Sequence, residues 1–169
     1  SFKYLEIMLN KLLSKQIDRN TLLICMGGGV IGDLTGLVAS LTLRGIDFIQ
    51  IPTTLLAQVD SSVGGKTAIN SKYGKNLIGT FNQPRMVIIS LSFLKKLPKR
   101  QLIAGYAEIL KYSLIKSKPF FKWLNINSKK IINLNVKACS KAIRESCRIK
   151  SEVVSSDEKE KGIREILNF

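Results

Sequence analysis

The sequence predicts an α/β domain followed by an all-helical domain. Helical spacings of apolar residues alternate with short apolar runs over residues 2–51, and a glycine-rich turn joins the first such run to the next helix. After Leu97-Pro98 only helical patterns remain. Alternation of strand, helix and strand is typical of a doubly wound parallel sheet. We therefore place a partial α/β domain at residues 1–97 and a partial helical domain at residues 98–169.

Hydrophobic spacing places the elements of the first domain. Residues 2–17 carry apolar side chains three and four positions apart, which predicts a helix with one buried face that includes Phe2 and Leu13. Residues 21–26 are wholly apolar, the pattern of a strand buried on both faces of a parallel sheet. We further expect a helix at 30–43, a strand at 46–51, a short helix at 54–60, a ribbon or ordered loop at 64–79, a strand at 86–89 and a helical turn at 90–96.

The second domain is expected to hold three helices and no strand. They cover residues 100–115, 119–126 and about 131–155, and Pro119 suits the first turn of the middle helix. The longest helix would bury a stripe formed by Leu134, Ala138, Ala142, Cys147 and Ile149. Both ends of the chain stop within apolar patterns, so we expect a fragment truncated at both ends.

Composition narrows the functional classes. A hydrophobic content of 45% over 169 residues fits a packed globular protein. No apolar run approaches the roughly 18–20 residues that cross a bilayer, so no membrane partner is expected. Three cysteines without a CxxC pattern indicate buried reduced thiols of a cytoplasmic protein. The absence of histidine excludes histidine-based acid–base chemistry and a histidine-ligated metal within this stretch.

The net charge of +15 allows two interpretations. Residues 95–150 carry fifteen Lys and Arg against only Glu108 and Glu145. A basic surface of this kind can bind nucleic acid. The cations are spread along helical patterns, however, and aromatic residues between them are sparse, which favours solvated lysine faces with a few lysines of a site. We expect no nucleic-acid partner and keep a basic nucleic-acid-binding module as the alternative from another class.

A glycine-rich turn follows the first predicted strand. Residues 27–32 satisfy G-x-G-x-x-G between a strand and a helix, where glycine lets the backbone approach a pyrophosphate and the helix N-terminus attracts it. No acid ends the second strand to hold a ribose, which departs from the usual dinucleotide-binding fingerprint. Asp33 lies one residue past the last glycine, and either complements the dipole of the helix start or contacts a cofactor.

The stretch from Pro52 to Asn76 combines small hydroxyls, one acid, a Gly-Gly pair and two lysines. This mixture suits a site that holds phosphates and hydroxyls close to the backbone. Lys66 follows glycine, but a Walker motif would need glycine at position 60, which is Asp60, so a P-loop NTPase is not expected. Exposed loop lysines are the other interpretation of Lys66 and Lys75.

Charged residues of the helical half leave alternatives open. Glu108 and Lys111 share a helix face three residues apart, which allows a surface ion pair. Glu108 also lies among small and apolar residues, which suggests an inward carboxylate that needs a cation, a metal or a proton. From spacing alone, solvent exposure is expected for Lys150, Arg164 and Asn168.

These motifs together closely resemble the 3-dehydroquinate synthase family over nearly the whole chain. The matching stretches are residues 27–33, Arg44-Gly45, residues 52–70, Gly74-Lys75-Asn76, Ala107-Glu108, Lys111-Tyr112, Arg164 and Leu167-Asn168. The resemblance implies conversion of 3-deoxy-D-arabino-heptulosonate 7-phosphate to 3-dehydroquinate and phosphate in the shikimate pathway. It also implies catalytic NAD, a divalent metal (zinc or cobalt), a cytoplasmic location and a homodimer of the full-length protein.

The resemblance assigns roles to individual residues. Cofactor contacts would come from Gly29, Val30, Ile31, Gly32, Asp33, Thr53, Thr54, Phe93, Leu94, Lys95 and Lys96. Asp60, Lys66, Lys75 and Asn76 would lie where cofactor and substrate meet. Glu108 would be the carboxylate ligand of the metal. The substrate would be gripped by Lys111, Lys150, Arg164 and Asn168. Arg44 would reach the site of a neighbouring subunit.

The chain also departs from the family pattern. The two histidine ligands of the metal and the N-terminal portion that binds the adenosine ribose have no counterpart here, so we expect this exact chain to bind zinc weakly and not to turn over. Lys96 replaces a usual threonine, and Ser90 stands where an aspartate is common. A related sugar phosphate cyclase and an NAD- and metal-dependent polyol dehydrogenase remain as alternatives within the superfamily.

Overall fold

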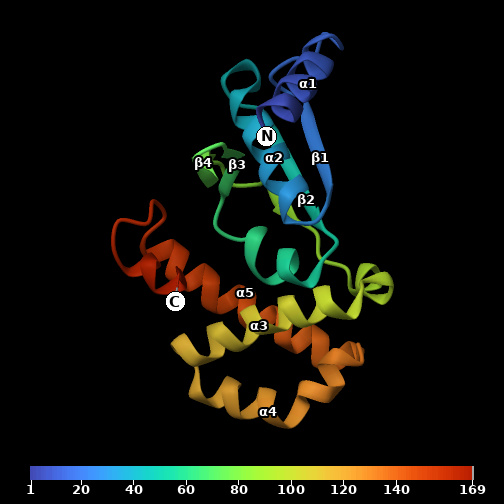
Figure 1. Ribbon diagram of the computed structural model, residues 1–169, viewed down its shortest axis with the longest axis vertical. Helices are drawn as coiled ribbons and strands as arrows, with labels where there is room; N and C mark the ends of the chain where they lie inside the picture. The colour runs from blue at the N-terminus through green and yellow to red at the C-terminus, as the bar shows by residue number, and fades with distance from the viewer. Residues whose placement is uncertain (169) are drawn as a thin grey trace. The chain divides into compact units, whose positions relative to one another are not determined.

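The chain forms two compact units that interleave along the sequence. A computed structural model describes residues 1–168 (Figure 1). The first unit is Ser1–Pro52 with Gly65–Ile88, and the second is Thr53–Gly64 with Ile89–Phe169. The boundary predicted at Leu97-Pro98 falls inside the second unit. Residues 53–64 join the later helices although they lie between two segments of the α/β unit.

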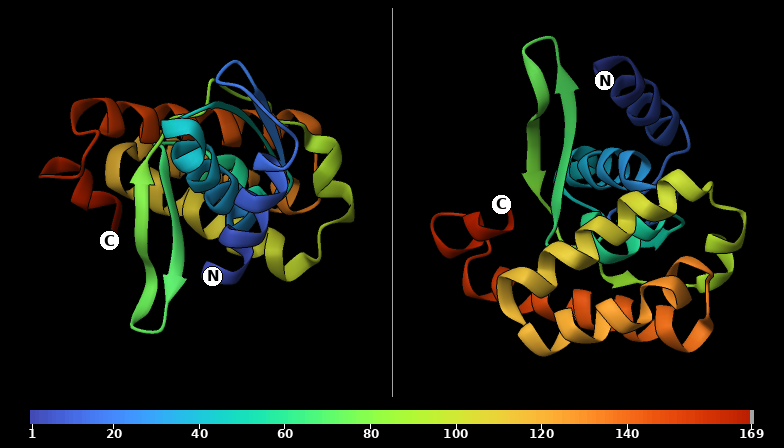
Figure 2. Two further views of the ribbon diagram at one scale, coloured as in Figure 1. Left: turned by 90° about the horizontal axis from the view of Figure 1, so that it is seen from above. Right: turned by 60° about the horizontal axis from the view of Figure 1, so that its bottom comes forward.

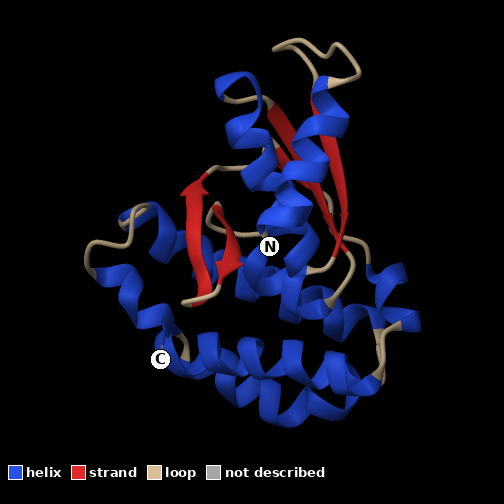
Figure 3. Ribbon diagram, turned by 45° about the horizontal axis from the view of Figure 1, so that its top comes forward, coloured by secondary structure: helices blue, strands red, loops and turns tan. Residues whose placement is uncertain are grey.

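The first unit is an α/β layer with an added ribbon. Its elements are α1 (Phe2–Leu13), β1 (Leu22–Gly27), α2 (Gly29–Leu41), β2 (Asp47–Pro52), β3 (Lys66–Ser71), β4 (Gly74–Phe81) and β5 (Met86–Val87). The sheet has the order β1-β2-β5 with parallel pairs, and Leu22 is in register with Asp47. Figure 3 shows the strands of this unit in red beside its helices in blue. The strands β3 and β4 pair antiparallel, which confirms the predicted ribbon.

Small residues bring α2 close to its neighbours. A Cβ at Gly32 would lie 2.0 Å from Gln50 Nε2, and a Cβ at Gly36 would lie 2.3 Å from Thr67 Cγ2. Glycine is therefore the residue that permits these approaches. The adjoining Leu37 and Val38 are buried in the core of this unit.

The prediction that β1 is buried on both faces is wrong. Leu22, Ile24 and Met26 are 44–66% exposed, whereas Cys25 between them is buried. Side chains alternate between the two faces of a strand, and α2 lies against one face of this sheet. Within the described part of this unit, no element covers the other face. In α1, likewise, Leu5 is buried but Phe2 and Leu13 are exposed, so the predicted buried face is narrower than expected.

The second unit is helical. Its elements are the π-helical turn η2 (Ala57–Ser61), the 3₁₀ turn η3 (Leu91–Lys96), α3 (Lys99–Lys116), α4 (Lys118–Ile132), α5 (Val136–Ser156) and the 3₁₀ turn η4 (Ile163–Asn168). Each of the three long helices contacts the other two (Figure 2). Their fully buried core includes Ile109, Leu124 and Ile149.

Side-chain caps fix where these helices begin. Ser117 Oγ accepts a hydrogen bond from Phe120 N at 3.3 Å, and Pro119 lies in the first turn of α4 as predicted. Asn135 Oδ1 accepts from Ala138 N at 3.1 Å and caps α5. None of the described helices combines the length and apolar character that crossing a bilayer requires.

The predicted break after residue 126 is wrong, because α4 continues to Ile132. The chain turns instead at residues 133–135, where Asn135 offers a capping side chain. Leu134 therefore lies in the link, with a φ of 56°, and not on the buried stripe of α5. Ala138, Ala142 and Ile149 do form that stripe, and Cys147 is half-buried beside it.

Candidate functional site

The second unit gathers charged side chains around Asp60, which lies in the π-helical turn η2. Thr54 Oγ1 accepts a hydrogen bond from Ala57 N at 3.1 Å, and this bond helps to start the turn. Leu55 and Val59 anchor the turn in the helical core. Single π-helical turns often occur at functional sites, where the extra residue redirects a side chain.

Asp60 is held by two buried partners from different helices. Tyr112 of α3 donates its hydroxyl to Asp60 Oδ1 at 2.5 Å. Lys150 Nζ of α5 donates to the same oxygen at 2.6 Å and to the backbone carbonyl of Asp60 at 2.7 Å. Tyr112 is fully buried and Lys150 is 8% exposed, so these bonds lie largely away from water.

This environment shifts the pKa of each member. Burial disfavours the charged form of Asp60, but the charge and hydrogen bond of Lys150 and the hydroxyl of Tyr112 outweigh it and lower the pKa of the carboxyl. Burial lowers the pKa of Lys150 despite its attraction to Asp60, and the neighbouring cations Arg164 and Lys111 lower it further. The pKa of Tyr112 is raised by burial and by Asp60, so its hydroxyl stays protonated.

A second pair lies one helical turn apart on α3. Lys111 Nζ lies 2.6 Å from Glu108 Oε2 and donates to the backbone carbonyl of Leu167 at 2.9 Å. The two side chains are 21% and 26% exposed, and Glu108 Oε2 itself is buried. The ion pair that the spacing allowed is therefore formed, but it is half-buried and does not lie on the open surface.

Arg164 is the most deeply buried cation of this unit, with 1% exposure. Its Nη2 donates to the backbone carbonyl of Gly64 at 2.7 Å, and its Nη1 donates to the carbonyl of Glu158. Gly64 has a φ of 105°, and a Cβ there would lie 2.6 Å from Arg164 Nη2. The expected exposure of Lys150 and Arg164 is wrong. The aliphatic parts of both side chains pack inside the unit, and their charged nitrogens donate hydrogen bonds to backbone and carboxylate oxygens.

The segment before η4 is organised by Asp157. Its two carboxylate oxygens accept hydrogen bonds from the backbone N–H groups of Lys161, Gly162 and Arg164 at 2.8–3.2 Å. These bonds lower the pKa of Asp157. Asn168 is exposed as predicted and donates to Glu160 Oε1 at 3.0 Å. Arg164 and Asn168 share η4, but only Arg164 points into the unit.

The cluster holds three cations from three elements. Lys111, Lys150 and Arg164 lie with the carboxylates of Asp60 and Glu108, and the carboxylate of Asp157 also attracts Arg164. Several fixed cations in a partly buried site suit an anionic ligand, because charge-assisted hydrogen bonds are the strong ones. Among residues 1–168, no group of three His, Cys, Asp or Glu side chains is placed to hold a metal ion. Glu108 is therefore a possible single ligand and not a metal site by itself.

The glycine turn of the first unit leaves the start of α2 open. The helix begins at Gly29, and its capping position Gly28 has no side chain to satisfy the first N–H groups. Val30 and Ile31 beside it are exposed. An anionic group can be bound by such a helix start. Asp33 is the fifth helical residue and half-buried, so complementing the dipole at the helix start is not its role.

The ribbon carries the two predicted lysines at opposite ends. Lys66 is in register with Phe81, while Lys75 lies six residues before Phe81, a separation of about 20 Å along the strand. The structure does not bring these two backbones together. Asn76 adopts a φ of 55°, and its backbone N–H donates to Asn70 Oδ1 at 2.9 Å.

The other predicted residues have varied settings. Thr53 and Phe93 are half-buried, and Lys95 and Lys96 are exposed at the end of η3. Leu94 is 1% exposed and belongs to the helical core, so its side chain is unavailable to a cofactor. Arg44 is exposed and left-handed, with a φ of 70°.

The predicted site omits two residues that organise it. Tyr112 holds Asp60, and its position four residues after Glu108 on one helix face was the available signal. Asp157 shapes the segment that delivers Arg164. Its role depends on three backbone contacts that no sequence spacing displays.

Comparison with protein families matches the whole chain in two parts. Residues 1–104 match the family described as 3-dehydroquinate synthase N-terminal, and residues 105–169 match 3-dehydroquinate synthase C-terminal. A 3-dehydroquinate synthase of Pelagibacter ubique is 58% identical over 94% of this chain and 43% of its own length. One from Rhodospirillum rubrum is 52% identical over all of this chain and 44% of its own length. The chain thus spans less than half of these relatives.

Solved structures give a similar result. The 2-epi-5-epi-valiolone synthase of Streptomyces hygroscopicus subsp. jinggangensis, with NAD⁺ and Zn²⁺ bound, has a TM-score of 0.94 at 28% identity, over all of this chain and 48% of its own. A 2-deoxy-scyllo-inosose synthase complexed with carbaglucose-6-phosphate, NAD⁺ and Co²⁺ has a TM-score of 0.84 at 30% identity, over all of this chain and 46% of its own.

Proposed function

Because the chain belongs to the 3-dehydroquinate synthase family, we propose that it carries substrate- and cofactor-binding parts of an enzyme that converts 3-deoxy-D-arabino-heptulosonate 7-phosphate to 3-dehydroquinate and phosphate. One observation carries the proposal. Three cations gather around two carboxylates in one helical unit, with Lys150 and Arg164 buried. A substrate with a carboxylate and a phosphate needs several fixed cations of this kind.

The chain's own residues divide the work as follows. Asp60, itself held by Tyr112, fixes the position of Lys150 Nζ. The ammonium group is therefore already oriented before the substrate binds. Its lowered pKa eases release of a proton from Nζ, which suits a group that passes a proton to and from the substrate. Glu108 holds Lys111 Nζ, which donates charge-assisted hydrogen bonds to the substrate's oxygens. Arg164 holds η4 against Gly64 and thereby positions the segment around Leu167.

The residues of the glycine turn fit a dinucleotide. A Cβ at Gly27 would lie 2.7 Å from Ile31 Cβ, so the turn is tight, and the start of α2 offers backbone N–H groups to a pyrophosphate. We assign Gly29 to Asp33 to the binding of NAD, which in such enzymes accepts and returns a hydride. NAD is bound in both cyclase structures named above.

The described residues do not fit a metal by themselves. Zinc sites in enzymes have three protein ligands, and Glu108 stands without two further candidates among residues 1–168. We propose that Glu108 contributes to a zinc site of the full-length enzyme, as supported by Zn²⁺ and Co²⁺ in the related structures.

Substrate binding tests the proposed function. Titration calorimetry of the 169-residue chain with 3-deoxy-D-arabino-heptulosonate 7-phosphate should give saturable binding that Lys111→Gln weakens about tenfold or more, since a charge-assisted bond is lost. Lys116→Gln, an exposed lysine on the same helix, is the matched control and should bind normally. Equal binding by both variants would contradict the role of Lys111.

The related cyclases are the second candidate function. The structures named above, at 28–30% identity, support it, whereas relatives at 52–58% identity are 3-dehydroquinate synthases. Carbaglucose-6-phosphate separates the two. Tighter binding of this compound than of the heptulosonate phosphate would assign the chain to the cyclases.

We also propose that the full-length enzyme is a cytoplasmic homodimer to which Arg44 contributes. The free thiols of Cys25, Cys139 and Cys147 suit a reducing compartment. Arg44 is exposed in a left-handed turn and can reach outward. Light scattering of the full-length protein measures the oligomer, and Arg44→Gln should reduce activity without changing the fold. A monomer of full activity would contradict this proposal.

A further inference from the structure

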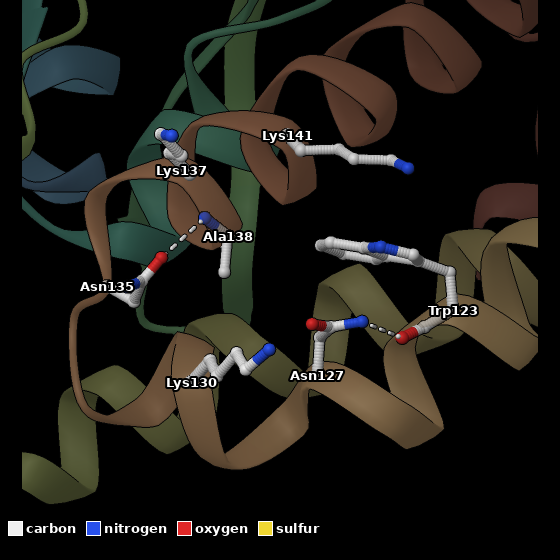
Figure 4. A pocket seen from close by; sticks show the side chains of 7 residues that line it. All are labelled: Trp123, Asn127, Lys130, Asn135, Lys137, Ala138 and Lys141. Atoms are coloured by element: carbon white, nitrogen blue, oxygen red, sulfur yellow. Dashed lines mark hydrogen bonds between the residues drawn. The ribbon is translucent and has the colours of Figure 1, made fainter.

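A hollow of about 360 Å³ lies between α4 and α5, and none of its lining residues belongs to the candidate site (Figure 4). Trp123, Asn127 and Lys130 of α4 form one side. Asn135 and the first turns of α5 form the other. The volume is at the lower end for small-molecule sites, so it suits a ligand the size of a small metabolite.

Positive charge gathers at this hollow without compensation. Lys130 comes from α4, and Lys137 and Lys141 lie one turn apart on α5. Among the described residues, no acidic side chain forms an ion pair with any of the three. The N-terminus of α5 adds its partial positive charge at the same place, since Asn135 is its capping residue. All three lysines are exposed, and Figure 4 shows their side chains extending in different directions. An anion bound in the hollow would attract their flexible ammonium groups toward it.

The remaining lining residues give the hollow a fixed shape. Lys141 Nζ lies 4.6 Å from the ring centroid of Trp123. The ring also stacks on Phe120 of the same helix, with centroids 6.0 Å apart. Asn127 Nδ2 donates to the carbonyl of Trp123 at 3.0 Å. Asn135 Oδ1 accepts a hydrogen bond from Ala138 N at 3.1 Å, and the NH₂ group of this exposed side chain is a further donor beside the hollow. Figure 4 shows the indole between Lys141 and Asn127.

We propose that this hollow is a binding site for a small phosphate-bearing anion. Lys130, Lys137 and Lys141 supply the charge, and the amide of Asn135 supplies a directed donor. Ala138 is only 5% exposed and Lys141 Nζ lies over the ring of Trp123, so the edge of the indole is the apolar surface that remains for the carbon part of a phosphate ester. Such a mixture of a few placed polar groups and aromatic surface is typical of metabolite sites.

The single tryptophan of the chain makes the site directly measurable, because Trp123 lines it. The 169-residue chain is titrated with inorganic phosphate while indole fluorescence is recorded, with sodium chloride at matched ionic strength as the reference. We expect a saturable change with a midpoint on the order of 1 mM. Lys137→Gln/Lys141→Gln should raise the midpoint about tenfold or more. Lys116→Gln/Lys129→Gln removes the same charge from exposed positions outside the hollow and should leave it unchanged.

Three outcomes would overturn the proposal. An equal response to chloride would mean general screening. An unchanged midpoint in Lys137→Gln/Lys141→Gln would place phosphate elsewhere. A response to a 20-bp duplex but not to phosphate, with steep salt dependence, would make the hollow part of a nucleic-acid surface.

Discussion

Replacing Asp60 by Asn should unfold the second unit more easily, because it leaves Lys150 buried beside Arg164 and Lys111 without a counter-charge. Removing one partner of a buried ion pair costs about 3–5 kcal/mol. The Asp60 side chain is 32% exposed, so water screens part of this interaction and we expect about 2–3 kcal/mol. Lys150→Met, which removes the charge and keeps most of the volume, should cost a similar amount because Asp60 then loses its cation.

A double-mutant cycle isolates the pair. Urea unfolding followed by the fluorescence of Trp123 reports on the second unit, where that residue lies. The double variant Asp60→Asn/Lys150→Met should be more stable than the sum of the single effects predicts, by about 1–3 kcal/mol. Lys116→Met, at an exposed position, is the control and should stay within about 0.5 kcal/mol of the parent. A coupling energy below about 0.5 kcal/mol would refute the view that this pair holds η2 to α5.

The pKa of Asp60 is lowered in the folded chain, so the ionised carboxylate stabilises the fold above its ordinary pKa of about 3.9, and this stabilisation is lost as the pH falls below that value. The difference in free energy of unfolding between the parent and Asp60→Asn, measured in urea, should therefore shrink as the pH falls through this range. Gly64→Ala should lower the free energy of unfolding by about 1–3 kcal/mol, since φ of Gly64 is 105° and a Cβ there would clash with Arg164 Nη2. Gly162→Ala is the control, because its Cβ would lie 3.9 Å from the nearest atom. Equal melting temperatures of the two variants would contradict the clash. Burial raises the pKa of Cys147 to about 11, so iodoacetamide at pH 8 should label this thiol roughly a hundredfold more slowly than an ordinary one. Rapid labelling of Cys147 in the folded chain would contradict its burial. Zinc should bind this chain weakly in competition with a chelating dye, and phosphate release from the heptulosonate phosphate should stay at background. Tight zinc binding that is lost in Glu108→Gln, or metal-dependent turnover, would show that the described residues are enough to form the metal site.

Much of the fold could be predicted because its signals are local. The strand, glycine turn and helix over residues 22–41 follow from hydrophobic spacing and from the conformational freedom of glycine. Pro119 marked the first turn of α4 for the same kind of reason. The errors also have local causes. A wholly apolar strand gives no sign of which face is covered, so the exposure of Ile24 and Met26 was missed.

The candidate site depended on contacts between distant parts of the chain. Tyr112 and Asp60 are separated by 52 positions, Lys150 and Asp60 by 90, and Arg164 and Gly64 by 100. Periodicity cannot reveal such pairs, because it reports only on the face of one element. The burial of Lys150 and Arg164 was therefore predicted wrongly from spacing, although the motifs had already marked both residues.

The sequence by itself determined the order of the main elements, the glycine turn at the start of α2 and the family to which the motifs of residues 52–76 point. Only the tertiary structure decided that residues 53–64 belong to the helical unit. Only there does Asp60 meet Tyr112 and Lys150. The physical reason is that local propensity fixes helices and turns, whereas a buried charge is tolerated only where folding brings a partner to it from elsewhere in the chain.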